Sequence, residues 1–204
     1  IGVATIPKCW GSQIKYDEDM YPIAYPIVDN STDLLKLKIP NLDETAQWLM
    51  EEIDSYVEMG YDKRSIGLPD LQGPLNVAMR IINDNRFMSL VAKARLGKNE
   101  KYDTIVKHIM NVCSDCYIEI KKKLYTATNR SIKGKWSVSG CTYYYLRPDQ
   151  WERFIIPIIE KCQQELGEDV NLHHCGQADA NRIKSYHKID WVSCEFGFGS
   201  DLKT

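Results

Sequence analysis

The chain has 204 residues, a formal net charge of −2 and a pI near 6.1, and 44% of its residues are hydrophobic. This length suits one domain with a hydrophobic core and is short for two. The small net charge argues against a nucleic-acid partner and against an anionic membrane surface. No apolar run approaches the roughly 18 residues that a membrane-spanning helix needs, so we expect no membrane partner.

Residues 1–40 are polar and contain prolines at positions 7, 22, 26 and 40. Proline removes a backbone donor and interrupts a helix interior. We therefore predict an irregular lead-in, with at most one short edge strand at residues 21–28.

The first predicted helix begins at Asn41, where Glu44 three residues later makes a start that resembles a capping box. Gly60 is a suitable end for it. A short strand is predicted at residues 65–68. The next helix is predicted to begin at Pro74, because proline fits the first helical position, where its missing N–H does no harm.

Apolar residues at helical spacing predict a long helix over residues 102–124. A strand is predicted at residues 136–139. Pro148 begins a further helix, which Pro157 should kink and Gly167 should end.

Strands are predicted at residues 169–173 and 190–196, with a short helix between them. Helix and strand thus alternate through residues 41–204 without a hairpin signal, which indicates βα units and a parallel sheet. A complete (β/α)8 barrel takes about 250 residues. We therefore predict that residues 1–204 form one α/β domain that is part of such a barrel.

Both ends of the sequence favour a fragment of a longer protein. The chain starts at Ile1 without an initiator Met, and residues 201–204 are typical of the first turn of a helix.

The seven cysteines lie in segments predicted to be helical or extended. A secreted domain held by disulfides would have denser cysteines in loops, so reduced thiols and a cytoplasmic location are expected. Cys113 and Cys116 have C-x-x-C spacing, but they fall inside the long helix, which favours two core cysteines.

The sharpest chemical feature is the run L-H-H-C-G at residues 172–176, where a predicted strand ends. The active sites of parallel barrels lie at the carboxyl ends of the strands, and imidazole and thiolate are preferred zinc ligands. His173 and Cys175 are therefore candidate metal ligands. The spacing alone fits a buried cysteine beside a hydrogen-bonded histidine equally well. His174 should point to the opposite side of the strand and be structural.

Several segments, in order, resemble the uroporphyrinogen decarboxylase superfamily, which includes methyltransferases that act on corrinoid proteins and thiols. Arg147 stands where the superfamily commonly has Ser. The resemblance implies a (β/α)8 TIM barrel, of which this chain would be an incomplete fragment. The segments are residues 69–78 (a Gly-Pro segment), 146–157 (a Pro-containing helix), 172–176 (H-x-C-G) and 196–202 (a glycine-rich turn).

The resemblance is closer to the methyltransferase branch, because the decarboxylases lack the cysteine of H-x-C-G and have a tyrosine where Arg80 stands here. It implies His173 and Cys175 as zinc ligands, with another cysteine ligand beyond Thr204. Glu195, at the end of the next predicted strand, is a candidate oxygen ligand or an ion-paired carboxylate of the rim.

The implied function is a zinc-dependent transfer of a methyl group from a corrinoid, carried by a partner protein, to a small thiol. Asp70 and Arg80 are candidates for binding a charged end of the substrate, or are surface ion-pair residues. Two alternatives remain open: a uroporphyrinogen decarboxylase of porphyrin and heme biosynthesis, which needs no metal, and a member of the superfamily that binds without turnover.

Overall fold

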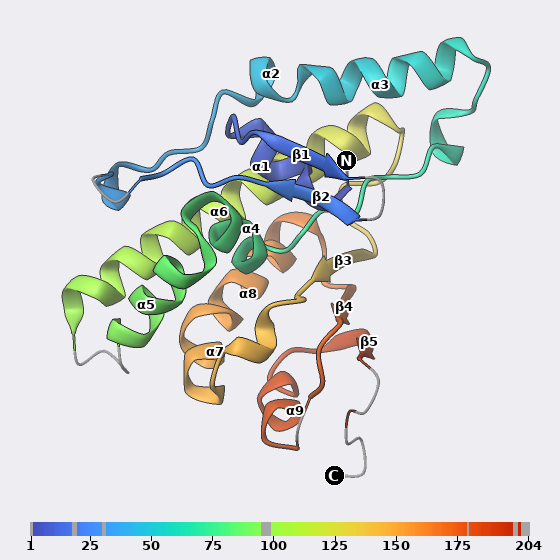
Figure 1. Ribbon diagram of the computed structural model, residues 1–204. Helices are drawn as coiled ribbons and strands as arrows, with labels where there is room; N and C mark the ends of the chain where they lie inside the picture. Colours follow the sequence, from blue (N-terminus) through green and yellow to red (C-terminus); the bar gives the residue numbers. More distant parts are fainter. Residues whose placement is uncertain are drawn as a thin grey trace.

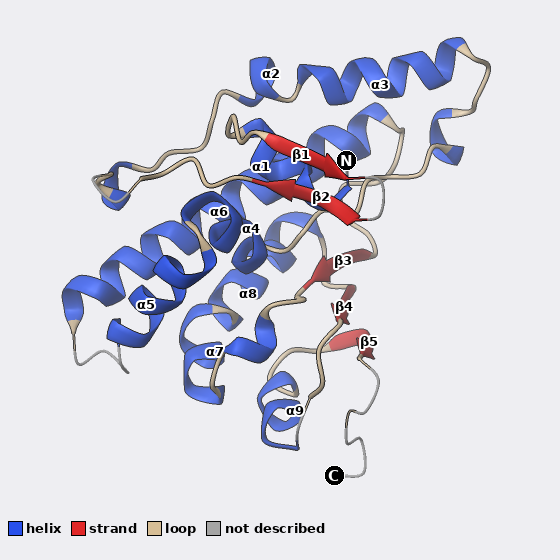
Figure 2. Ribbon diagram, in the orientation of Figure 1, coloured by secondary structure: helices blue, strands red, loops and turns tan. Residues whose placement is uncertain are grey.

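The computed structural model describes residues 2–17, 20–29, 32–94, 99–178, 180–197 and 200. Helices dominate this part of the chain, and strands form two separate small sheets (Figure 1, Figure 2). The helical turn predicted at residues 201–204 and part of the glycine-rich turn lie outside the described residues. Every helix that the structure describes is too short or too polar to cross a membrane.

The lead-in is more regular than its prolines suggest. After the short helices η1 (Gly2–Ala4) and α1 (Thr5–Cys9), strands β1 (Ile14–Asp17) and β2 (Met20–Ala24) pair antiparallel. The strand predicted within residues 21–28 is confirmed as β2, whereas β1 was not predicted. Pro22 is tolerated in β2 because both strands of a two-stranded sheet are edge strands, where a missing donor can face away from the partner.

The helix predicted after Asn41 exists, but it is interrupted. Asn41 accepts a hydrogen bond from Asp43 N and begins α2 (Leu42–Thr45), which breaks at Ala46 before α3 (Gln47–Glu58). Gly60 follows this helix with a φ of 91°, a left-handed conformation that glycine adopts without strain. Upstream, η2 (Leu34–Lys36) is a single turn.

The prediction of a strand at residues 65–68 is wrong. The chain forms the single turn η3 (Lys63–Ser65) and meets the parallel sheet only at Gln72, in a bridge to Ser139. Pro74 then begins a helix at its first position, as predicted.

Three helices pack together in the middle of the chain: α4 (Pro74–Ile82), α5 (Asp84–Ala94) and α6 (Glu100–Ala127). The long helix is confirmed as α6, which buries Cys113 and Cys116 completely in the core. Helix α5 was not predicted.

The βα units predicted for the second half of the chain are confirmed. They comprise β3 (Trp136–Ser139), the turn η5 (Tyr143–Tyr145), α7 (Pro148–Phe154), α8 (Ile156–Leu166), β4 (Val170–His174), α9 (Ala180–Tyr186) and β5 (Trp191–Phe196). The predicted kink is a break at Ile155, two residues before Pro157.

Strands β3, β4 and β5 form a parallel sheet in chain order, with α7, α8 and α9 along one side (Figure 1). Among the described residues the sheet has these three strands and the bridge at Gln72, so it is an open α/β sheet and not a closed barrel. Since the strands are parallel, their carboxyl ends meet at one edge of the sheet. This edge is called the rim below.

Candidate metal centre

Strand register brings two cysteines together at the rim. Ser139 of β3 lies opposite His173 of β4, and Gly140 N donates to His173 O at 2.8 Å, which extends the ladder one step further. Cys141 and Cys175 each follow this pair by two residues, so both strands deliver a cysteine to the same place. Their Sγ atoms lie 2.9 Å apart.

His173 completes the cluster. Its Nε2 lies 2.8 Å from Cys175 Sγ, and one ligand atom from each of Cys141, His173 and Cys175 lies within 4.8 Å of the others. The cluster therefore contains two sulfurs and one imidazole nitrogen, at and just beyond the carboxyl ends of two neighbouring strands.

Glu195 of β5 fixes the orientation of this imidazole. It lies opposite His173 in the sheet, and its Oε2 is 2.7 Å from His173 Nδ1. A carboxylate on Nδ1 favours the tautomer in which Nδ1 carries the proton, and it leaves the Nε2 lone pair facing the sulfurs. Metal-bound histidines are commonly oriented by such a carboxylate.

The donor set fits zinc. Two thiolates and one imidazole are soft and borderline ligands that zinc prefers, and three protein ligands leave a fourth tetrahedral position for a substrate. In the protein alone, burial and then the hydrogen bond with Cys175 raise the pKa of Cys141 to about 12. A bound cation would oppose this effect, because it stabilises the deprotonated thiol.

A close backbone contact holds the turn that carries Cys175. Gly197, just after β5, donates its N–H to Gly176 O at 3.1 Å. A Cβ at Gly197 would lie 2.0 Å from Cys175 O, a distance that no side chain tolerates. Glycine at this position therefore permits the two strand ends to pack.

The turn that carries Cys141 is held from the other side by a buried amide. Asn76 of α4 is 3% exposed. Its side chain donates to Ser139 O at 3.1 Å and to the Gln72 side chain, and it accepts from Thr142 N at 3.2 Å and from the Thr142 hydroxyl. The amide thus forms hydrogen bonds with the backbone on both sides of Cys141.

The comparisons with known proteins agree with this architecture. The sequence model of the family described as "Uroporphyrinogen decarboxylase (URO-D)" matches residues 1–196. The chain belongs to the uroporphyrinogen decarboxylase family. A methyltransferase from Methanosarcina mazei has a similar fold, with a TM-score of 0.62 at 17% sequence identity. The match covers 86% of this chain and 50% of that one, so the chain spans half the length of this structural relative. No curated protein matches the sequence.

Two of the predicted ligands of this family member, His173 and Cys175, come together in the structure. Sequence reasoning missed Cys141, although the same signal pointed to it: Cys141 follows the predicted strand at residues 136–139 just as Cys175 follows the next one. The cysteine ligand expected beyond Thr204 stays a prediction, and Cys141 offers a second sulfur within the chain.

The structure gives the other predicted residues different surroundings. Glu195 faces the Nδ1 side of His173, away from the sulfurs, so its geometry is that of a positioning carboxylate. Asp70 accepts a hydrogen bond from Ser139 Oγ at 2.8 Å, beside the cluster. Arg80 of α4 pairs with Asp84, the first residue of α5, and both side chains are about half exposed. The roles of Asp70 and Arg80 in binding a substrate stay predictions.

His174 is structural, as its position in the strand predicted. It is fully buried on the helix-facing side of β4, and its Nδ1 lies 2.8 Å from Gly176 O. The rings of Tyr144, Tyr186 and Phe196 surround it. Adjacent strand residues point to opposite faces, which is why His173 and His174 have such different environments.

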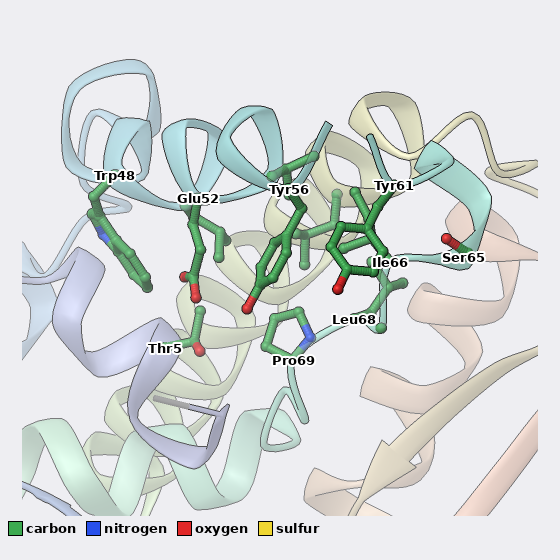
Figure 3. A pocket seen from close by; sticks show the side chains of 13 residues that line it. Thr5, Trp48, Glu52, Tyr56, Tyr61, Ser65, Ile66, Leu68 and Pro69 are labelled. Atoms are coloured by element: carbon green, nitrogen blue, oxygen red, sulfur yellow. The ribbon is translucent and has the colours of Figure 1, made fainter. Parts of the chain in front are cut away.

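A separate cavity of about 510 Å³ lies between α3 and the segment that follows it (Figure 3). Trp48, Glu52, Tyr56 and Tyr61 line it, together with Thr5 of α1. It shares no residue with the cysteine–histidine cluster, so it is distinct from the predicted site.

Proposed function

We propose that this chain contributes the metal-binding part of a zinc-dependent methyltransferase of the uroporphyrinogen decarboxylase family. The transfer would move a methyl group from a corrinoid, carried by a partner protein, to a small thiol, and the complete fold would be a (β/α)8 barrel. The family membership, the fold shared with a methyltransferase and the cluster of two sulfurs and one imidazole support this proposal.

The observation that carries it is the meeting of Cys141, His173 and Cys175 at one point of the rim. A bound zinc ion would supply a positive charge that holds the thiol substrate as its nucleophilic thiolate at neutral pH. A porphyrin decarboxylase that uses no metal would have no need for this cluster.

The residues of the chain have separate tasks in this proposal. Cys141 and Cys175 supply sulfur ligands, His173 supplies Nε2, and Glu195 keeps the imidazole in the required tautomer and orientation. Cys175 is exposed, so a small thiol can approach the cluster from its side. Asp70, beside the cluster, would contact a charged end of that thiol, and Arg80 is a second candidate for the same task. The reduced thiols fit a cytoplasmic protein.

Zinc content decides between the alternatives. We expect about one zinc per chain by inductively coupled plasma mass spectrometry in protein from the complete reading frame. Cys175→Ser and Cys141→Ser should each lose most of this metal, because a serine hydroxyl is a much poorer ligand. Cys113→Ser is the matched control, since this thiol is buried in α6, and it should retain the metal.

Zinc in all variants would mean that the metal lies elsewhere, and no zinc in any of them would reject the methyltransferase. In the second case a metal-free decarboxylase or a binding role within the family would remain, and both can be tested with porphyrin substrates. Retention of zinc in Cys141→Ser alone would assign the second sulfur ligand to another cysteine.

A further inference from the structure

We propose that Cys141 and Cys175 form a site of reversible oxidation, in which a peroxide converts the two thiols into a disulfide. The bond would remove both sulfurs from the metal centre and release the ion. This consequence rests on the proposed function, whereas formation of the bond depends only on the two cysteines.

The pairing of β3 with β4 favours the geometry that the bond requires. Ser139 and His173 are partners in parallel strands, and each cysteine lies two residues further along the chain, just beyond the end of its strand. Neighbouring strands are about 4.8 Å apart, within the range of about 4.4–6.8 Å between Cα atoms joined by a disulfide. The two Sγ atoms lie 2.9 Å apart, so a small side-chain rotation is enough to bond them.

The exposure of the two thiols gives them different parts in the reaction. Cys175 is exposed and can meet a peroxide, whereas Cys141 is half-buried directly behind it. Such an arrangement, an accessible thiol beside a second one, is typical of redox-sensing cysteines. Cys194 provides a comparison within the same sheet: it is also exposed, but its sulfur has no contact with another cysteine among the described residues.

The chemistry balances with hydrogen peroxide as the oxidant. The Cys175 sulfur attacks one peroxide oxygen, the O–O bond breaks, and a sulfenic acid and one water are formed. The Cys141 sulfur then attacks the Cys175 sulfur, the S–O bond breaks, and a second water leaves. Two thiols have lost two electrons and two protons, and a dithiol reductant reverses the reaction by thiol–disulfide exchange.

The test treats the complete protein with hydrogen peroxide after zinc has been removed with a chelator. We expect an intact-mass decrease of about 2 Da, loss of two of the seven free thiols, and a peptide that joins Cys141 to Cys175. Dithiothreitol should restore the mass and both thiols. Cys141→Ser should instead accumulate oxygen adducts on Cys175, and Cys194→Ser should behave as the natural protein.

Two results would overturn the inference: sulfinic acid on Cys175 while Cys141 stays reduced, or disulfides that link two chains. In zinc-loaded protein, peroxide should release the ion in step with loss of the thiols, measured with a chelating dye. Formation of the disulfide in a protein that never binds zinc would support this inference and contradict the proposed function. Failure of the inference can therefore be distinguished from failure of the proposed function.

Discussion

Two pairs of cysteines in this protein differ both in their spacing along the sequence and in their position in the structure. Cys113 and Cys116 have the C-x-x-C spacing of redox and metal motifs, yet both are completely buried within α6. Cys141 and Cys175 are 34 residues apart and meet at the rim, with His173 beside them. The comparison shows that strand register, more than sequence spacing, decides which thiols can act together.

Burial explains the inertness of the first pair. Removal from water raises the pKa of the Cys113 and Cys116 thiols well above the ordinary value, because it disfavours the charged thiolate. Only the thiolate binds metal or reacts as a nucleophile. In the rim pair the pKa of Cys141 is also raised, but the pair is reachable from solvent and has an imidazole as its neighbour, so a metal ion or an oxidant can reach its sulfurs.

The sharpest test of this contrast is thiol alkylation. In chelator-treated native protein at pH 8, iodoacetamide should label Cys175, while Cys113 and Cys116 react at least about 1,000-fold more slowly, because their exposure requires unfolding. Peptide mass spectrometry over time gives the rates. Labelling of the α6 pair as fast as Cys175 would mean that this helix is not packed as described.

The carboxylate behind His173 should have the next largest effect. Glu195→Gln should lower zinc affinity about 10- to 100-fold, because the neutral amide orients the imidazole less strongly. Competition with a chelating dye measures the affinity. Glu165→Gln, which removes an exposed carboxylate paired with Lys122 on the helical side, should leave it unchanged.

The size of the Glu195 effect also separates two roles. Complete loss of zinc would indicate that Glu195 is a direct ligand. An unchanged affinity would show that Glu195 does not contribute to zinc binding.

Serine substitutions should separate stability from metal binding. Cys113→Ser places a hydroxyl in an apolar core and should lower the free energy of unfolding by about 1–3 kcal/mol, with zinc retained. Cys141→Ser should instead leave the free energy of unfolding nearly unchanged and lose zinc, since Cys141 is only half-buried and is a proposed zinc ligand. Urea denaturation and zinc content, measured on both variants, test this crossed pattern. Equal loss of zinc in both variants would couple the two regions.

Acid should affect the two regions at different pH. Hydrogen bonding to Arg153 and Lys107 lowers the pKa of Asp103 on α6. The stability that this carboxylate contributes, about 1 kcal/mol or less, is therefore present above its ordinary pKa near 3.9 and is lost as the pH falls through the lower value in the folded protein. Asp103→Asn should flatten the pH dependence of unfolding below about pH 4.

Zinc should dissociate at a higher pH than the pH at which Asp103 becomes protonated, because protons compete with the metal for its ligands. Parallel acid titrations of zinc content and of stability test the order. Loss of stability before loss of zinc would contradict it.

The sequence by itself determined the elements whose signals are local. Helical periodicity located α6, Pro74 and Pro148 marked helix starts, and alternating helices and strands predicted the parallel sheet. It also placed His173 and Cys175 at a strand end, because the end of an apolar run followed by glycine is visible in a short segment. Local signals failed where pairing decided the outcome, as in the β1–β2 hairpin and at residues 65–68.

Tertiary structure alone decided the composition of the site. Cys141 belongs to it because β3 and β4 pair with Ser139 opposite His173, and Glu195 faces His173 because β5 pairs in the matching register. A shift of one residue in either pairing would turn these side chains to the opposite face of the sheet. Such registers depend on packing between segments far apart in the chain, and no short stretch of sequence contains that information.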